Sequence, residues 1–280
     1  MLSSIELNVD SSINSGQVFL WEKHDNIWYG INGKDILSIN ESPFRIRSSG
    51  KTPDFFRKTD NLKKILNEIS KDKIIKSAID HSNGLRLLRQ DPFQCYISFI
   101  VSSNSSIQNI KQTLQKLCKK FGKKIEFEKK EFFLFPEPEI LSKASNIELQ
   151  SCGLGYRAKF VKEASSAVSS GKIDFGKLKK MSYHDSKSAL MEVFGIGNKV
   201  ADCILLFSLE KLDAFPLDRW MLRILQKYYS DKFTIEGQTL TDKKYNELHE
   251  KIVSYFGPYA GYSQQFLFKM ERDHNQKRWL

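Results

Sequence analysis

Four short runs of aromatic and β-branched residues lie between positions 17 and 48, whereas apolar residues recur at helical spacing through most of the chain that follows. The runs cover residues 17–23, 27–32, 35–40 and 44–48. Asn32-Gly33, between two of them, tolerates the positive φ angles of a tight hairpin turn. Because such short connections allow only antiparallel pairing, the sequence predicts an antiparallel meander. The fold class is therefore α+β: an N-terminal antiparallel β-sheet domain with covering helices, followed by a mostly α-helical domain.

The predicted boundary between these domains gives residues 1–88 and 89–280. Apolar residues at helical spacing from Phe55 to Ile69 predict a helix that covers one face of the sheet. After the boundary, Asp91-Pro92 begins a helix, with aspartate as its N-cap and proline in its first turn. Residues 107–121 predict a further helix that ends at Gly122, and residues 125–133 predict a small hairpin.

Charge is the property of the composition that bears most directly on function. Lys and Arg number 44 against 33 Asp and Glu, a net charge of +11. A globular chain this basic is typical of proteins that bind a polyanion, with nucleic acid as the first candidate and a merely solvated surface as the alternative. No apolar run approaches the ~18 residues of a membrane span, and no secretory signal is recognisable. We therefore expect an intracellular protein, in the cytoplasm or at the nucleoid of a prokaryotic cell.

The cysteines and histidines predict neither a metal site nor a cofactor. The four cysteines form no Cys-x-x-Cys pair, which disfavours a zinc ribbon and an iron–sulfur cluster. The five histidines show no metal-ligand spacing. If the chain is an enzyme, ordinary side chains must carry out its chemistry.

The most informative segment lies at about residues 186–209, where Gly195-Ile196-Gly197 joins two apolar-periodic stretches. Two glycines allow a tight turn and a close approach to a partner, and the next helix begins with free N–H groups. Free donors and the helix dipole favour an anion such as a phosphate. A plain connection between two helices explains the glycines equally well when they are considered alone.

Lys199 lies in the first turn of the second helix, whose body is largely apolar. Poor solvation and the positive end of the helix disfavour the ammonium form and favour the neutral amine that nucleophilic attack requires. Cys203 follows four residues later on the same helical face. Taken alone, Lys199 favours a phosphate contact and Cys203 a core position. Asp218, after Pro216, predicts an N-cap that can also face the lysine.

The order Gly-x-Gly-x-Lys, apolar helix, Pro-x-Asp resembles the helix–hairpin–helix base-excision DNA glycosylases (HhH-GPD superfamily), and among them the 8-oxoguanine DNA glycosylase/AP lyases. Other motifs similar to theirs follow in the same order along nearly the whole chain. They are Ser15-Gly16-Gln17-x-Phe19-x-Trp21, Arg89-Gln90-Asp91-Pro92, Ser102-Ser103-Asn104, Gly153-Leu154-Gly155-Tyr156-Arg157-Ala158 and Phe256-Gly257-Pro258-Tyr259-Ala260-Gly261-Tyr262-Ser263-Gln264.

This resemblance implies a bifunctional enzyme that flips 8-oxoguanine out of duplex DNA and excises it. In the family a lysine, matched by Lys199, attacks C1′ and forms a Schiff base with the sugar, and β-elimination then cleaves the strand. Asp218 matches the aspartate that stabilises the oxocarbenium-like centre. The resemblance implies no cofactor for this chemistry.

The resemblance also assigns the base-binding residues. Cys203 and Phe268 match the pair that sandwiches the flipped base, and Gln264 matches the glutamine that reads its Watson–Crick edge. Gly16 matches a glycine whose carbonyl accepts the N7–H that distinguishes 8-oxoguanine from guanine. Gln264 and Phe268 are four residues apart on a predicted helix, so they share a face independently of the resemblance.

Contacts with the duplex are implied for two further groups of residues. Asn104, Tyr156 and Arg157 match residues that fill the gap left by the flipped base and contact the orphaned base. The backbone from Gly195 through Gly197 to Val200 matches the segment that holds a phosphate.

Two positions depart from the pattern of eukaryotic members. Asn109 replaces an arginine that reads the opposite cytosine, so we expect 8-oxoguanine to be excised opposite several bases. Trp220 replaces a phosphate-contacting histidine, which puts that contact in doubt.

Two other functions remain open: a monofunctional glycosylase for other damaged bases, and a non-catalytic DNA-binding module. The pair of Lys199 and Asp218 favours the bifunctional enzyme over both. We expect double-stranded DNA containing 8-oxoguanine as the partner, no membrane, no obligate protein partner, and a monomer.

Overall fold

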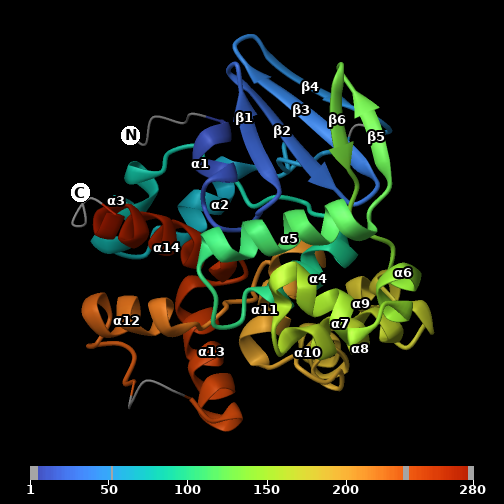
Figure 1. The fold of residues 1–280 in the computed structure, drawn as a ribbon. Coiled ribbons are helices and arrows are strands. Elements are labelled where there is room, and N and C mark those ends of the chain that lie inside the picture. Colours follow the sequence, from blue (N-terminus) through green and yellow to red (C-terminus); the bar gives the residue numbers. More distant parts are fainter. Residues whose placement is uncertain (1–5, 52, 236–239, 277–280) are drawn as a thin grey trace.

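A four-stranded antiparallel sheet lies over a body of helices, with α5 running beneath it (Figure 1). The computed structural model describes residues 6–51, 53–235 and 240–276. The strands are β1 (Trp21–His24), β2 (Ile27–Asn32), β3 (Asp35–Glu41) and β4 (Phe44–Ser48), in that spatial order, and β5 (Lys124–Phe127) pairs with β6 (Lys130–Phe133) in a separate hairpin. The helices are α1 (Val9–Ile13), α2 (Leu62–Ile69), α3 (Lys73–His81), α4 (Pro92–Val101), α5 (Ile107–Phe121), α6 (Pro138–Lys143), α7 (Asn146–Leu149), the π-helix η1 (Gln150–Leu154), α8 (Arg157–Ser169), α9 (Phe175–Lys180), α10 (Tyr183–Met191), α11 (Asn198–Ser208), α12 (Arg219–Tyr228), α13 (Asp242–Phe256) and α14 (Ala260–Gln276).

The predicted meander and its central turn are confirmed. Asn32 pairs with Asp35 across the turn, where Gly33 has a φ of 64°. The first strand is shorter than predicted, because β1 begins only at Trp21. The preceding segment is fixed by a buried side chain instead: the amide of Gln17 donates to the Arg86 carbonyl and accepts from the Leu88 N–H, at 2.9 Å each.

A small apolar core lies on one face of this sheet. Gly30 leaves room for the Trp21 indole, since a Cβ atom there would lie 2.0 Å from that ring. Trp21 stacks on Phe55 with ring centroids 5.0 Å apart, and Val9 and Ile13 of α1 complete the cluster together with Phe56, Leu88 and residues of β2 and β3.

The predicted helix from Phe55 to Ile69 is wrong in its start and in its packing. Phe55 lies in the preceding loop, and α2 begins only at Leu62, where Asn61 caps it. The buried residues of α2 belong to the larger core of the helical body, and α2 packs against α14. An apolar helical stripe predicts burial, but it does not identify the surface that the stripe packs against.

This larger core draws residues from both sides of the predicted domain boundary, and α14 packs against α2, α3, α12 and α13. The division at residues 88 and 89 stays a prediction. Among the described residues, no helix is long and apolar enough to cross a membrane.

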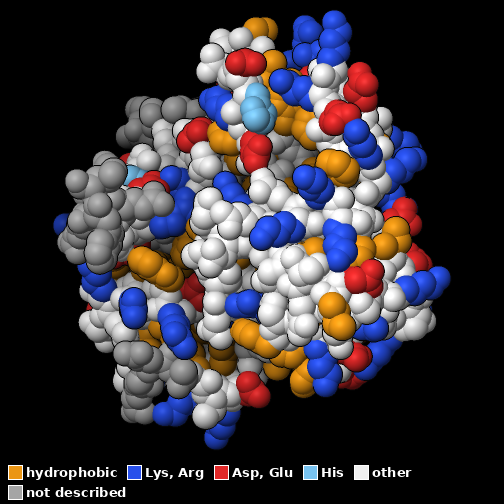
Figure 2. All heavy atoms as spheres, viewed as in Figure 1, with side chains coloured by type: hydrophobic (Ala, Val, Ile, Leu, Met, Phe, Trp, Pro, Cys, Tyr) orange, Lys and Arg blue, Asp and Glu red, His pale blue; other side chains and the backbone are white. Residues whose placement is uncertain are grey.

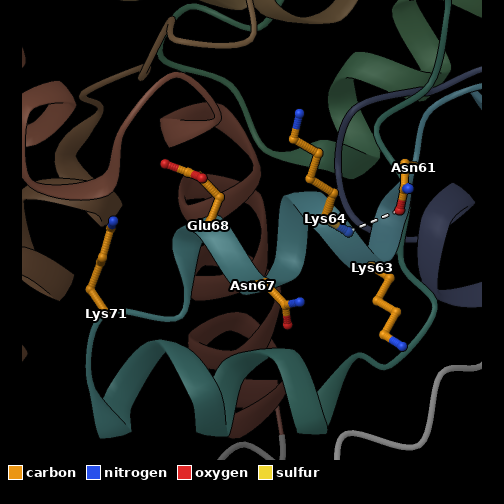
Figure 3. A pocket seen from close by; sticks show the side chains of 6 residues that line it. All are labelled: Asn61, Lys63, Lys64, Asn67, Glu68 and Lys71. Carbon is orange, nitrogen blue, oxygen red and sulfur yellow. Dashed lines mark hydrogen bonds between the residues drawn. The ribbon is translucent and has the colours of Figure 1, made fainter.

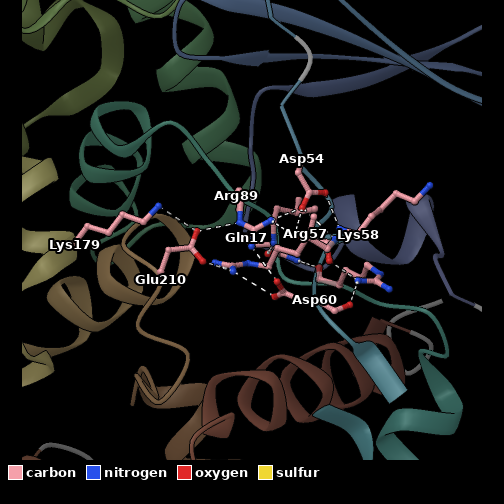
Figure 4. Close-up of polar contacts among 11 residues, drawn as sticks. Gln17, Asp54, Arg57, Lys58, Asp60, Arg89, Lys179 and Glu210 are labelled. Atoms are coloured by element: carbon pink, nitrogen blue, oxygen red, sulfur yellow. Dashed lines mark hydrogen bonds and ion pairs between the residues drawn. The ribbon is translucent and has the colours of Figure 1, made fainter. Parts of the chain in front are cut away.

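A network of ion pairs links the N-terminal part of the chain to the end of α11 (Figure 4). Glu210, two residues after that helix, pairs with Arg57 and with Arg89, whose Nε lies 3.1 Å from its carboxylate. Arg89 also pairs with Asp60 at 2.9 Å and with Asp54. The Arg57 side chain is only 1% exposed. Because a buried guanidinium without a carboxylate is costly, these pairs hold the two parts of the chain together.

Replacing Glu210 with Gln should lower the free energy of unfolding by about 3 kcal/mol at pH 7, because Arg57 then stays buried without its closest carboxylate. Urea unfolding measures the loss. Glu247→Gln is the matched control. Its pair with Lys243 spans 3.9 Å between exposed side chains and should contribute less than about 1 kcal/mol.

The same comparison has a defined pH dependence. Burial opposes ionisation of Glu210, but the charges of Arg57 and Arg89 outweigh it and lower the pKa of this carboxyl below its usual value. A carboxylate with a lowered pKa stabilises the fold above the pKa of the unfolded chain and loses this effect as pH falls through the folded value. The difference in stability between parent and Glu210→Gln should therefore begin to shrink as the pH falls through about 4, near the pKa of an unfolded glutamate, and should disappear below the lowered pKa of the folded protein. A constant difference down to pH 3 would contradict this assignment.

Candidate active site

The turn between α10 and α11 needs a glycine at its first position. Gly195 has a φ of 94°, and a Cβ atom there would lie 2.5 Å from the ring of Phe160. The backbone of the turn is therefore seated directly on a side chain of α8. This close approach accounts for Gly195 without reference to any ligand.

Gly197 has no such internal reason to be a glycine. It is the N-cap of α11 with a φ of −101°, and its side-chain position has no atom within 4 Å. No side chain caps this helix, so its first N–H groups, up to that of Val200, are available to a ligand. Open space over free donors at a helix N-terminus is the arrangement that a phosphate requires.

Lys199 lies one position inside α11, half-buried, and reaches across to the end of α4. Its Nζ donates to the Ser102 hydroxyl at 3.1 Å and lies 5.4 Å from the ring centroid of Phe99. The amine is thus held between a hydroxyl and an aromatic face. Ser102 is also the C-cap of α4, immediately before the segment that carries Asn104.

Cys203 lies close to this amine, and Asp218 lies within electrostatic range of the Cys203 thiol. Cys203 is 3% exposed, and burial raises the pKa of its thiol to about 12, with Lys199 lowering it and Asp218 raising it. The thiol is therefore protonated at neutral pH. Asp218 caps α12 by accepting from the Met221 N–H at 2.8 Å, as predicted. The thiol of the predicted site thus interacts electrostatically with both the amine and the carboxylate.

Gly16 lies in a loop that the C-terminal helix holds in place. Gln265 of α14 donates from its amide to the Ser15 carbonyl at 2.7 Å. Gly16 has a φ of 88°, and a Cβ atom there would lie 3.2 Å from the ring of Phe268. Two residues 252 positions apart, predicted to bind the same base, therefore lie side by side.

Gln264 lies one helical turn before Phe268, on the same face of α14. Its side chain is buried, and its amide oxygen has no hydrogen-bond partner among the described residues. The start of α14 packs on α11, because Gly261 is seated against Leu206. The helix that carries Gln264 and Phe268 is thus brought against the helix that carries Lys199.

The sequence analysis missed Arg272 at this place. Its Nη1 lies 3.1 Å from the side-chain position of Gly16, and its guanidinium lies 5.8 Å from the ring centroid of Phe268. It also donates to the Asn14 carbonyl. The spacing of four residues from Gln264 to Phe268 continues to Arg272, so helical periodicity could have identified it.

Asn104, Tyr156 and Arg157 come together at the other side of the turn. The Arg157 guanidinium donates to the Ser103 carbonyl at 2.7 Å and to the Asn104 carbonyl at 3.0 Å, and it lies 4.7 Å from the Tyr156 ring centroid. Asn104 itself adopts a φ of 50°. The arginine therefore fixes both the loop and the ring of an exposed tyrosine.

An aromatic row connects Tyr156 to the turn of the hairpin. Tyr156 contacts Phe160 at 5.7 Å, and Phe160 contacts Phe194 at 5.1 Å, both edge to face. Tyr156 is 55% exposed and Phe194 58% exposed. Exposed rings beside cations suit stacking on nucleic-acid bases and sugars.

Neither the distribution of charged side chains nor the surface depressions of the molecule identify the site. Lys and Arg side chains are spread over the face in view, from the strands to the lower helices, with Asp and Glu between them (Figure 2). A surface depression of about 470 Å³ on α2 is lined by side chains of that helix and its flanks (Figure 3), and it includes none of the predicted site residues. A larger hollow of about 1150 Å³, between α1 and α2, includes none either.

Comparisons with known proteins identify the family of this chain. The family described as "HhH-GPD superfamily base excision DNA repair protein" matches residues 97–253, and "8-oxoguanine DNA glycosylase, N-terminal domain" matches residues 1–96. The N-glycosylase/DNA lyase OGG1 of Arabidopsis thaliana is 31% identical over 96% of this chain and 79% of its own length. A probable N-glycosylase/DNA lyase of Methanothermobacter thermautotrophicus is 33% identical over 72% of this chain and 68% of its own.

A solved structure also covers almost all of the fold. The 8-oxoguanine glycosylase/lyase of Clostridium acetobutylicum, bound to double-stranded DNA with cytosine opposite 8-oxoguanine, matches with a TM-score of 0.85 at 27% identity. The match covers 96% of this chain and 93% of that one. The chain belongs to the HhH-GPD superfamily of base excision DNA repair proteins.

Proposed function

We propose that this protein excises 8-oxoguanine from duplex DNA and cleaves the strand at the resulting abasic site. The observation that carries the proposal is the half-buried amine of Lys199 at the uncapped start of α11, beside the buried thiol of Cys203, on which the Asp218 carboxylate also acts electrostatically. Relatives with the names N-glycosylase/DNA lyase support both activities. We infer that it acts as a monomer on chromosomal DNA inside the cell.

The reaction follows from the amine and the carboxylate. Nζ of Lys199 attacks C1′, and the glycosidic C1′–N9 bond breaks with its electron pair leaving on the base. Asp218 stabilises the positive charge that develops at C1′. Opening of the sugar ring gives a C1′=Nζ Schiff base, loss of a C2′ proton then expels the 3′ phosphate, and the strand is cut.

Recognition of the base involves residues that lie outside the hairpin. Base flipping costs a few kcal/mol, which contacts in the pocket must offset. Cys203 and Phe268 sandwich the base, Gly16 accepts N7–H, and the unpartnered amide oxygen of Gln264 receives a donor from the Watson–Crick edge. A neutral thiol suits the first of these roles, because it packs against the base without adding charge.

Contacts with the rest of the duplex divide between two surfaces. Tyr156, Arg157 and Asn104 fill the gap and meet the orphaned base, and the backbone from Gly195 to Val200 holds a phosphate. Trp220 is 41% exposed at the start of α12, where its indole N–H can serve as a single neutral donor to the backbone.

Borohydride reduction should trap a covalent complex between the parent protein and a duplex containing 8-oxoguanine, because it reduces the Schiff base. Lys199→Gln should abolish both the adduct and strand cleavage. Lys251→Gln, which removes one exposed cation from α13, is the control and should leave both unchanged. An adduct that survives Lys199→Gln would eliminate Lys199 as the nucleophile, and a parent protein without adduct would favour a DNA-binding module.

The two glycines of the hairpin should respond differently to alanine. Gly195→Ala should lower the free energy of unfolding by at least about 1–2 kcal/mol, because it combines a strained φ with a clash on Phe160. Gly197→Ala should fold normally, since nothing opposes its methyl group, but should weaken binding to an abasic-site duplex about tenfold by blocking the phosphate.

Urea unfolding and fluorescence anisotropy measure the two effects. Wild-type affinity in folded Gly197→Ala would show that no phosphate approaches this turn.

Asn109 is exposed in the first turn of α5, and its short amide offers fewer donors than an arginine. We therefore expect excision rates opposite C, A, G and T to lie within about tenfold, which is about 1.4 kcal/mol of discrimination. Asn109→Arg should raise the preference for C. Single-turnover assays with the four duplexes test this, and a parent rate opposite C that exceeds the others by orders of magnitude would refute it.

A further inference from the structure

Asp202 is fully buried on α11, three residues after Lys199 and next to Cys203. Its carboxylate accepts from the hydroxyls of Tyr183 at 2.7 Å and Tyr245 at 2.6 Å, and it pairs with Lys187 at 3.3 Å. Nothing in the proposed reaction uses this carboxylate. A buried charge with so many partners must therefore have another role, structural or functional.

Tyr245 differs from Tyr183 in the partner of its second hydrogen bond, since the Tyr183 hydroxyl accepts from Nζ of Lys187 at 3.0 Å. The Tyr245 hydroxyl accepts from the N–H of Leu217 at 3.0 Å, while it donates to Asp202. Leu217 is 5% exposed and directly precedes Asp218. Two short buried hydrogen bonds thus connect the helix of the lysine to the peptide before the aspartate.

This connection joins the two elements whose relative position sets the geometry of the proposed catalytic residues. Lys199 and Asp218 are carried by different helices, α11 and the start of α12. Asp218 is bonded to its own helix by the side-chain cap at Met221 and by its carbonyl, which accepts from the Leu222 N–H at 2.9 Å. A hydroxyl that bonds both sides sets the separation of the two elements. Displacements of about 1 Å in a catalytic geometry are costly in rate.

We propose that Tyr245 is a positioning residue for base excision: through Asp202 and the Leu217 N–H it fixes Asp218 relative to the amine of Lys199. The inference rests on the proposed function. Asp202, which pairs with Lys187 at 3.3 Å, accepts from the Tyr245 hydroxyl at 2.6 Å and so holds it in place. The second lone pair of that hydroxyl then faces the Leu217 peptide.

Tyr183 supplies a matched control. Tyr183→Phe and Tyr245→Phe each remove one buried hydroxyl that donates to Asp202, but only Tyr245 also bonds the Leu217 peptide. Both variants should shift the urea unfolding midpoint by similar amounts. Tyr245→Phe should slow single-turnover release of 8-oxoguanine at least about tenfold, which is about 1.4 kcal/mol, while Tyr183→Phe stays within about twofold. Neither should change the affinity for an abasic-site duplex.

Three results decide the proposal. Equal slowing by both substitutions would overturn it, because the network would then act through the fold as a whole. Unchanged excision in both would overturn it as well. A parent protein that releases no 8-oxoguanine would instead reject the proposed function.

Should Tyr245→Phe fail to fold, 3-fluorotyrosine at position 245 retains the hydroxyl but weakens it as an acceptor. This change should slow base release severalfold, whereas the same change at Tyr183 should not. Equal rates for the two fluorinated proteins would also overturn the proposal.

Discussion

The close packing of the Gly195 backbone against the ring of Phe160 is the contact on which the candidate site depends. It fixes the turn before α11 against α8, and α11 begins two residues later with its donors free. The same ring contacts Tyr156 at 5.7 Å. The proposed phosphate-binding backbone and the proposed gap-filling side chain therefore rest on one aromatic support, so a shift of one would be transmitted to the other.

Buried charges fix α11 at two further points. In its middle, Asp202 is bonded by tyrosines and Lys187, and just beyond its end Glu210 pairs with Arg57 and Arg89. Ion pairs of this kind contribute little net stability compared with apolar packing, but breaking one is costly. These buried ion pairs therefore fix the position of α11 more than they raise the stability of the fold. Lys199, in the first turn of α11, would benefit from that rigidity.

The sequence predicted those features that depend on a few neighbouring residues. The caps at Asp91 and Asp218, the turn at Gly33 and the helix from Ile107 to Phe121 each need only local geometry, and each is confirmed. The roles assigned through the family resemblance stay predictions, although several of their residues lie together.

Local sequence patterns could not predict the tertiary contacts. Phe55 and α2 are not one helix, because Phe55 packs into the small core of the sheet and α2 into the larger core of the helical body. Their shared apolar spacing could not reveal this difference. Helical spacing places Arg272 on the face of Gln264 and Phe268, but its contact with Gly16 and that of Tyr245 with Leu217 are seen only in the structure. Each of these contacts joins segments far apart in the sequence, so no spacing rule includes them.

Two adjacent glutamines on α14 differ in whether their side-chain amides find hydrogen-bond partners within the protein. Gln265 satisfies its amide by donating to the Ser15 carbonyl and so secures the loop of Gly16. Gln264, equally buried, leaves its amide oxygen without a partner among the described residues. An unpaired buried acceptor costs about 1–3 kcal/mol, which a donor from a bound base would recover. In the proposed complex an extruded base would supply that donor, so an acceptor already in place would offset part of the cost of flipping.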